Sequence, residues 1–207
     1  MRFLLFSLAG IILCQCASDY RNLQTTGPDV ECAAKLAPTF LKTSWYNASI
    51  DVVGKHISGL LLIKNMPDSA KRVVFTNEAG VTFLDFGFSD SGDFKVYTVI
   101  RQLDKKPVIQ TLRKDFELIM GLPFKKGGYT RSVAGEEVYF AAVQKKETAY
   151  FITSKDCASL QRLEWGASRK KKVSVVLPGS AYPSPDRIEL IHHTFNMQIK
   201  LTRIQKE

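Results

Sequence analysis

The chain has 207 residues and a formal net charge of +9 at pH 7, and 45% of its residues are hydrophobic. A chain of this length can bury a sizeable core, so it does not belong to the class of mini-proteins that need metals or many disulfides to fold. The length also gives no reason to expect a second domain. The positive charge comes in short groups between apolar stretches, which is typical of solvated hairpin tips and edge strands, although it could also attract anionic lipid head groups. These groups are Lys105–Lys106, Lys125–Lys126, Lys145–Lys146 and residues 169–172.

Residues 1–15 have the features of an export signal. Arg2 is followed by an apolar run over residues 3–13. The run is about ten residues long, roughly half of what a membrane-spanning helix needs. No later apolar stretch reaches the length of a spanning helix, so the sequence predicts export without a transmembrane segment.

The end of this run resembles the lipobox of bacterial lipoproteins. Leu13 stands three residues before Cys16, and a polar stretch follows. The resemblance implies that the Cys16 thiol is acylated and that cleavage makes Cys16 the first residue of the mature chain. Gln15 and Cys14 depart from the family, which usually has small residues there. Ordinary signal cleavage after Ala17 is the alternative.

Residues 16–30 are predicted to form a flexible tether after the acylated cysteine, because they are polar and contain Gly and Pro. Residues 31–207 then form a single β-rich domain. The two remaining cysteines, Cys32 and Cys157, could form a disulfide in an oxidising compartment or remain buried thiols. Their spacing does not match a metal site.

Hydrophobic residues alternate with polar ones from Trp45 onward, which predicts half-buried strands. Short turns rich in Gly, Asp, Asn and Ser separate these strands, and we expect an antiparallel meander of five. The five strand sequences are YNASIDVV, HISGLLLIK, KRVVFTN, VTFLDFGFS and FKVYTVI.

One amphipathic helix is predicted over residues 107–121. Its apolar face comprises Val108, Leu112, Phe116 and Ile119, at intervals of three and four residues. Pro107 suits the first turn, and Gly121 suits the position after the last turn. Further strands follow to give about ten in all, and we interpret residues 186–204 as two strands that meet near residues 194–196 or as one long bent strand.

The predicted strands greatly outnumber the helices, and each strand has one apolar face, so the sheet must curve to bury that face. We expect the one predicted helix to pack inside the curve. The sequence predicts a mainly β fold, a strongly curved antiparallel sheet or half-open barrel wrapped round one central helix. This order of elements resembles the periplasmic lipoprotein carrier LolA and its receptor LolB. The stretches that carry the resemblance are GKHISGLLLIK, RVVFTNEAGVTFLDF, KPVIQTLRKDFELIMG and PSPDRIELIHHTFNMQIKLTRI.

Catalytic and metal-binding motifs are missing from the sequence. His192 and His193 would point to opposite faces of a strand, and we interpret them, with His56, as ordinary surface or turn residues. Asp90 and Asp93 lack the spacing of a calcium loop and indicate a hairpin turn. The sequence therefore predicts no enzyme, no cofactor and no metal.

Aromatic residues gather in one region of the predicted sheet. They would line its concave face as a filled core or as the wall of an apolar cavity for acyl chains. These candidate residues are Phe75, Phe83, Phe86, Phe88, Phe94, Tyr97 and Phe116.

Together these features predict a lipoprotein of the bacterial cell envelope that binds a lipid, a lipidated ligand or an apolar segment without catalysis. The alternative is a structural or assembly component of an envelope protein complex. Ala17 and Ser18 follow Cys16, and the absence of Asp there resembles a signal for the outer membrane. An exported protein rarely meets nucleic acid, so we expect the membrane, an acyl-chain ligand or an envelope protein as partner.

Overall fold

The computed structural model describes residues 18–29, 31–32, 43–52, 54–125, 128–167, 170–178 and 185–204. The predicted signal and Cys16 lie outside these residues. The described part contains a single sheet of thirteen strands and one long helix, α2. The strands are β1 (Gln24–Thr26), β2 (Ser44–Val52), β3 (Lys55–Asn65), β4 (Lys71–Thr76), β5 (Thr82–Phe88), β6 (Phe94–Val99), β7 (Tyr129–Ala134), β8 (Glu137–Gln144), β9 (Glu147–Ser154), β10 (Leu160–Ala167), β11 (Lys170–Val176), β12 (Arg187–His192) and β13 (Met197–Arg203).

All neighbouring strands in this sheet are antiparallel. The strand order is β1-β7-β8-β9-β10-β11-β12-β13-β2-β3-β4-β5-β6, so the last strand, β13, pairs with β2 in the middle of the sheet. The predicted five-strand meander is confirmed as β2 to β6. β12 and β13 confirm the prediction of two strands near the C-terminus.

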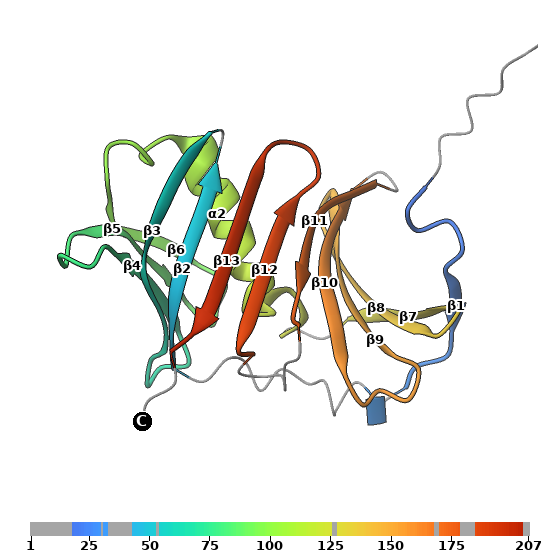
Figure 1. Ribbon diagram of the computed structural model, residues 1–207. Helices are drawn as coiled ribbons and strands as arrows, with labels where there is room; N and C mark the ends of the chain where they lie inside the picture. The colour runs from blue at the N-terminus through green and yellow to red at the C-terminus, as the bar shows by residue number, and fades with distance from the viewer. Residues whose placement is uncertain are drawn as a thin grey trace, which may run out of the picture.

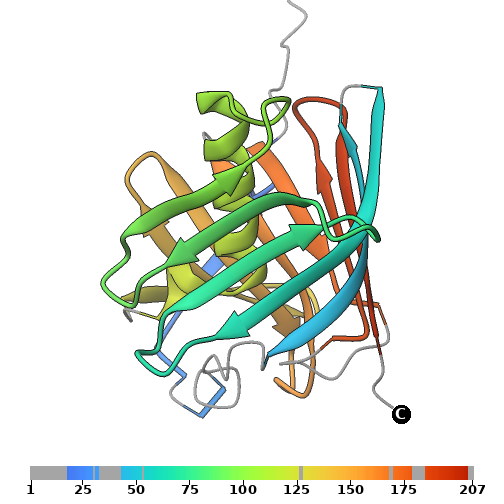
Figure 2. The same ribbon diagram turned by 90° about the vertical axis from the view of Figure 1, so that its left-hand side faces the viewer.

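The sheet is strongly curved, and α2 (Lys106–Ile119) lies within the curve, as Figures 1 and 2 show. We call the two ends of the sheet its wings: β2 to β6 form the first wing, β1 with β7 to β11 form the second, and β12 and β13 lie between them. α2 connects edge strand β6 of the first wing to β7 of the second, and the short helix η1 (Leu122–Phe124) follows it. The predicted curved sheet around one helix is confirmed.

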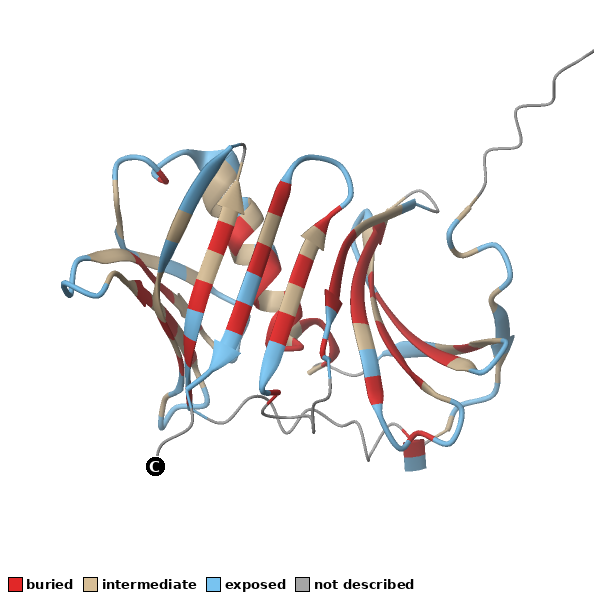
Figure 3. Cartoon of the chain, viewed as in Figure 1, coloured by how far each residue is buried: buried red, intermediate tan, exposed pale blue. Residues whose placement is uncertain are grey.

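The strands follow the expected alternation of buried and exposed side chains. Along β2, Tyr46, Ala48 and Ile50 are buried on the concave side, and Figure 3 shows the same banding on β12 and β13. On α2, Leu112, Phe116 and Ile119 are buried as predicted, whereas Val108 is half-buried against the core. Gly121 takes a φ of 66° after the last turn, a conformation that glycine adopts without strain.

The described sheet has more strands than the ten or so that the sequence predicts. Gly135, with a φ of 59°, forms a tight turn that pairs Ala134 with Glu137 and makes β7 and β8 two strands of a hairpin. β1 falls inside the predicted tether, and it is instead hydrogen-bonded to β7. The prediction of a flexible tether is therefore wrong for residues 24–26, because their backbone groups cover the free edge of the sheet.

Candidate functional site

The predicted aromatic residues are mostly packed core. Phe75, Phe86 and Phe116 are fully buried, and the rings of Phe86 and Phe116 meet edge to face with centroids 6.5 Å apart. Phe88 is also buried, whereas Phe83 and Phe94 are half-buried against the core. The space between this wing of the sheet and the helix is therefore filled by side chains from β4, β5 and α2.

The prediction that Tyr97 faces the concave side of the sheet is wrong. Its side chain is 50% exposed and lies beneath the charged groups of Arg72 and Lys95, at 4.3 and 4.7 Å from the ring centroid. A period of two places Phe94 and Tyr97 on opposite faces of β6, so both could not have lined one cavity. Of the predicted set, only Phe88 lines the cleft along α2.

A cleft with a volume of about 800 Å³ lies along the polar side of α2. The β5–β6 turn borders it from one wing, and the β8–β9 turn, β10 and β11 border it from the other. Its apolar lining comprises Phe88, Leu122, Pro123, Trp165 and Ala167. Its charged lining comprises the basic residues Arg113, Lys114, Lys125, Lys145, Lys146 and Lys172 and the acidic residues Asp90, Asp93, Glu117 and Glu147. The cleft is thus amphipathic, and it joins residues from five separate parts of the chain.

Glu147 holds one wall of the cleft against α2. Both Lys114 of the helix and Lys172 of β11 donate hydrogen bonds to its carboxylate, the latter at 2.9 Å. Burial alone would raise the pKa of Glu147, but these two ammonium groups outweigh it and keep the pKa below its usual value. Trp165 also connects β10 to α2, because its indole N–H donates a hydrogen bond to the backbone oxygen of Lys114 at 3.1 Å.

A smaller hollow of about 140 Å³ shares the side chains of Lys114, Glu147, Trp165 and Lys172 with the cleft. At its inner end, Asp115 Oδ2 lies 3.0 Å from Nε2 of His192, and both side chains are buried. Burial raises the pKa of Asp115, although the hydrogen bond with His192 acts in the opposite direction. Oδ1 of the same carboxylate has no hydrogen-bond partner among the described residues.

The two adjacent histidines do face opposite sides of the strand end, as predicted. His193 lies on the other face, where its Nε2 is 2.9 Å from the Ser174 hydroxyl. The interpretation of His192 as a surface or turn residue is wrong, because its ring packs against α2 and bonds Asp115. His56 is exposed and lies 2.7 Å from Asp51.

Asp115→Asn should change how stability depends on pH. The folded-state pKa of Asp115 lies above the usual value of 3.8, so the folded chain binds this proton more tightly than the unfolded chain does. The protonated Asp115 carboxyl group contributes its full share of the free energy of unfolding below pH 3.8. This contribution is lost as the pH rises through the folded-state pKa. Chemical denaturation at a series of pH values should therefore show wild type losing stability relative to Asp115→Asn as the pH rises from about 4. A difference that stays constant or has the opposite slope would contradict this assignment.

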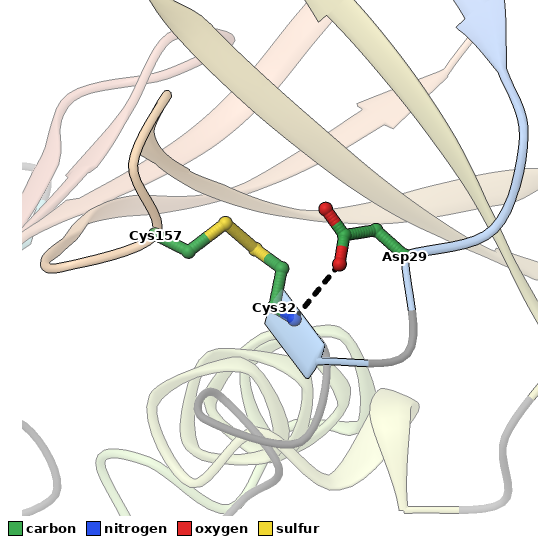
Figure 4. Close-up of side chains that lie close together, drawn as sticks. All are labelled: Asp29, Cys32 and Cys157. Atoms are coloured by element: carbon green, nitrogen blue, oxygen red, sulfur yellow. Dashed lines mark hydrogen bonds between the residues drawn. A yellow bond between two sulfur atoms is a disulfide. The ribbon is translucent and has the colours of Figure 1, made fainter.

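Cys32 and Cys157 form a disulfide that ties the N-terminal segment to the β9–β10 turn, with a Cα–Cα distance of 5.5 Å (Figure 4). Asp29 lies beside it, and its Oδ1 accepts a hydrogen bond from the Cys32 backbone N–H at 3.0 Å. These three side chains are close enough together to hold a metal ion. Both sulfurs are engaged in the disulfide, however, so the oxidised chain has no thiolate to offer there.

Asp90 and Asp93, which the sequence predicts in a hairpin turn, lie in the turn between β5 and β6. Asp93 closes the β5–β6 hairpin with Ser89, whose side chain accepts from the Asp93 backbone N–H at 2.8 Å, as the predicted turn requires. Asp90 pairs with Lys125 at 2.6 Å.

Over the described ranges, none of the helices is long and apolar enough to cross a membrane.

Comparisons with known proteins rest on the fold alone. No family model and no curated protein matches the sequence. A solved LolA superfamily protein from Nitrosomonas europaea aligns with a TM-score of 0.53 and 7% identity, over 87% of this chain and 93% of that one. A DUF1329 family protein from Desulfovibrio piger aligns with a TM-score of 0.46 and 8% identity, over 84% and 88% of the two chains. The likeness to the LolA superfamily protein shows that the curved open sheet around one helix is a LolA-like fold.

Proposed function

We propose that this chain is a lipid-anchored binding module of the bacterial cell envelope, and that its cleft holds an amphiphile with an acyl chain and an anionic head group. The observation that carries the proposal is the amphipathic lining of the 800 Å³ cleft. Small-molecule sites commonly have volumes of roughly 300 to 1,000 Å³ and combine apolar walls with a few polar groups. The LolA-like fold adds support, because its curved sheet surrounds α2 and forms the walls of the cleft along the helix.

The two kinds of lining residue suit the two parts of such a ligand. Trp165 and Ala167 from one wing and Phe88 from the other offer apolar contact for an acyl chain. Lys145 and Lys146 form the exposed tip of the β8–β9 hairpin at the border of the cleft. Ammonium groups attract a carboxylate or a phosphate, so the head group would lie at this tip and the chain deeper in the cleft.

Ala167→Trp should weaken ligand binding by about tenfold or more. The indole would fill part of the cleft, and the loss of one buried contact of a few methylene groups is sufficient for such a change. Titration with a fluorescent fatty acid measures the dissociation constant. Ala79→Trp is the matched control, because Ala79 is exposed in the β4–β5 turn and lies outside the cleft. Equal binding by both variants would contradict the proposed site.

The anchor is proposed to be the acylated thiol of Cys16. Cys16→Ser removes the nucleophile that accepts the diacylglyceryl group and leaves the apolar run intact. We expect mass spectrometry to show no lipidation of this variant, and fractionation to show no mature protein at the outer membrane. Cys14→Ser should be lipidated and anchored like wild type. If Cys14→Ser abolishes lipidation and Cys16→Ser does not, the anchor is misassigned.

A further inference from the structure

The described N-terminal segment is held on the outer face of the second wing. Asp19 Oδ2 accepts a hydrogen bond from the backbone N–H of Lys171 at 2.7 Å. Tyr20 donates to Glu164 Oε2 at 2.9 Å, and its ring stacks on Tyr150 with centroids 4.3 Å apart. A Cβ at Gly166 would lie 2.6 Å from the Tyr20 ring, so only glycine leaves room for this contact. Residues 19 and 20 are therefore fixed beside β10 and the start of β11.

Strand register shows which end of the sheet this is. Ala167 pairs with Lys170 across the β10–β11 hairpin, and Thr148, next to the β8–β9 turn, pairs with Gly166. Val173 pairs with His192, which places the β12–β13 turn at the same end. We call the tips of these three hairpins, at residues 145–146, 170 and 193–196, the basic end. In Figure 1 this end is at the top, and the blue N-terminal segment begins beside it.

The basic end has the chemistry of a membrane-facing surface. Lys145, Lys146 and Lys170 are exposed there, and Phe195 is 41% exposed at the neighbouring tip. Lysines are attracted to anionic head groups, and aromatic rings favour the interface between head groups and acyl chains. The hairpin tips at the opposite end of the second wing carry Glu136, Lys155 and Asp156 instead. The two ends thus differ in the sign of their charge.

We propose that the basic end lies against the anionic head groups of the membrane in which the chain is anchored, an inference that rests on the lipidated Cys16 of the proposed function. Only Ala17 separates Cys16 from Ser18, and consecutive Cα atoms are about 3.8 Å apart, so covalent geometry keeps the anchor within ~8 Å of Ser18. Residue 19 is bonded to the start of β11. A lipid on Cys16 therefore holds the β10–β11 tip close to the bilayer.

The cleft would then border on the membrane. Lys145 and Lys146 belong both to the basic end and to the cleft lining. An amphiphile could exchange its head group between the bilayer surface and these two ammonium groups while its acyl chain stays out of water. The orientation thus gives the cleft direct access to its proposed ligand.

Site-specific quenching tests the orientation. The lipidated chain is reconstituted in vesicles of phosphatidylethanolamine and phosphatidylglycerol that carry a head-group nitroxide. Because Cys32 and Cys157 are paired, an introduced cysteine offers a specific thiol for a fluorophore. A fluorophore at Lys146→Cys should be strongly quenched, and one at Lys155→Cys, on a tip at the opposite end, should be quenched little. Equal quenching, or stronger quenching at residue 155, overturns the orientation.

Charge removal tests the lipid preference separately from the anchor. The mature chain with Cys16→Ser, which cannot be acylated, should still sediment weakly with phosphatidylglycerol vesicles at low salt. Combined Lys145→Gln, Lys146→Gln and Lys170→Gln should lower this affinity on the order of a hundredfold, since each lysine near an anionic surface contributes about a factor of five. Lys155→Gln is the control and should bind like the parent chain. If the triple variant binds equally well, the lipid preference is wrong even when Cys16 is lipidated; missing lipidation in wild type would instead overturn the proposed anchor.

Discussion

Phe116→Ala should lower the free energy of unfolding by about 3 to 5 kcal/mol, as truncation of a fully buried aromatic side chain usually does. The ring of Phe116 is fully buried and meets Phe86 between α2 and β5. Its loss leaves a cavity between the helix and the first wing that rigid neighbouring strands can fill only in part. The midpoint of chemical denaturation, together with its slope, measures the change.

The control for this prediction lies on the same helix. Gln110 is exposed on α2, so Gln110→Ala should leave the midpoint nearly unchanged and shows that a helix substitution as such is tolerated. A Phe116→Ala midpoint close to that of wild type would mean that α2 does not fill the sheet as described.

Replacing both Cys32 and Cys157 by Ser should cost about 2 to 5 kcal/mol of stability. The disulfide links residues 125 positions apart, so its loss releases a long loop in the unfolded chain. It also frees the end of the segment that pairs as β1 with β7. Denaturation of the double variant, compared with wild type under oxidising conditions, gives the difference.

Reduction provides the matched test of the disulfide. Wild type in the presence of a reductant should unfold at the midpoint of the double variant, because both lack the same cross-link. The double variant itself should not respond to the reductant. If reduction leaves the wild-type midpoint at its oxidised value while the thiols are shown to be free, the disulfide is not a source of stability.

The fold was largely predictable because its signals are local. Alternation along β2 to β6 and the intervals of three and four in α2 each specify a buried face without reference to the rest of the chain. The sequence does not predict β1, because Gln24, Thr25 and Thr26 have no apolar face. Its strand conformation comes from pairing with the edge of β7, which only the tertiary structure supplies.

The candidate site was much less predictable. The cleft is lined mostly by turns and polar helix positions that are distant in sequence, and no spacing rule joins them. One signal could have been used: Asp115 follows Leu112 by three residues and so falls on the apolar face of the helix. A carboxylate at such a position needs a buried partner, and His192 supplies it. Tyr97 follows Phe94 by an odd number of residues, and the period of two of a strand therefore places it on the opposite face of β6.

The most direct test of the proposed ligand uses the two tryptophans of the chain. Trp165 lines the cleft, whereas Trp45 lies at the start of β2, at the end of the sheet opposite the β2–β3 turn. Brominated fatty acid quenches indole fluorescence only on contact. In Trp45→Phe, where Trp165 is the sole reporter, we predict saturable quenching; in Trp165→Phe, where only Trp45 remains, we predict none that saturates. Saturable quenching of Trp45 alone, or of neither residue, would contradict an acyl-chain site in the cleft.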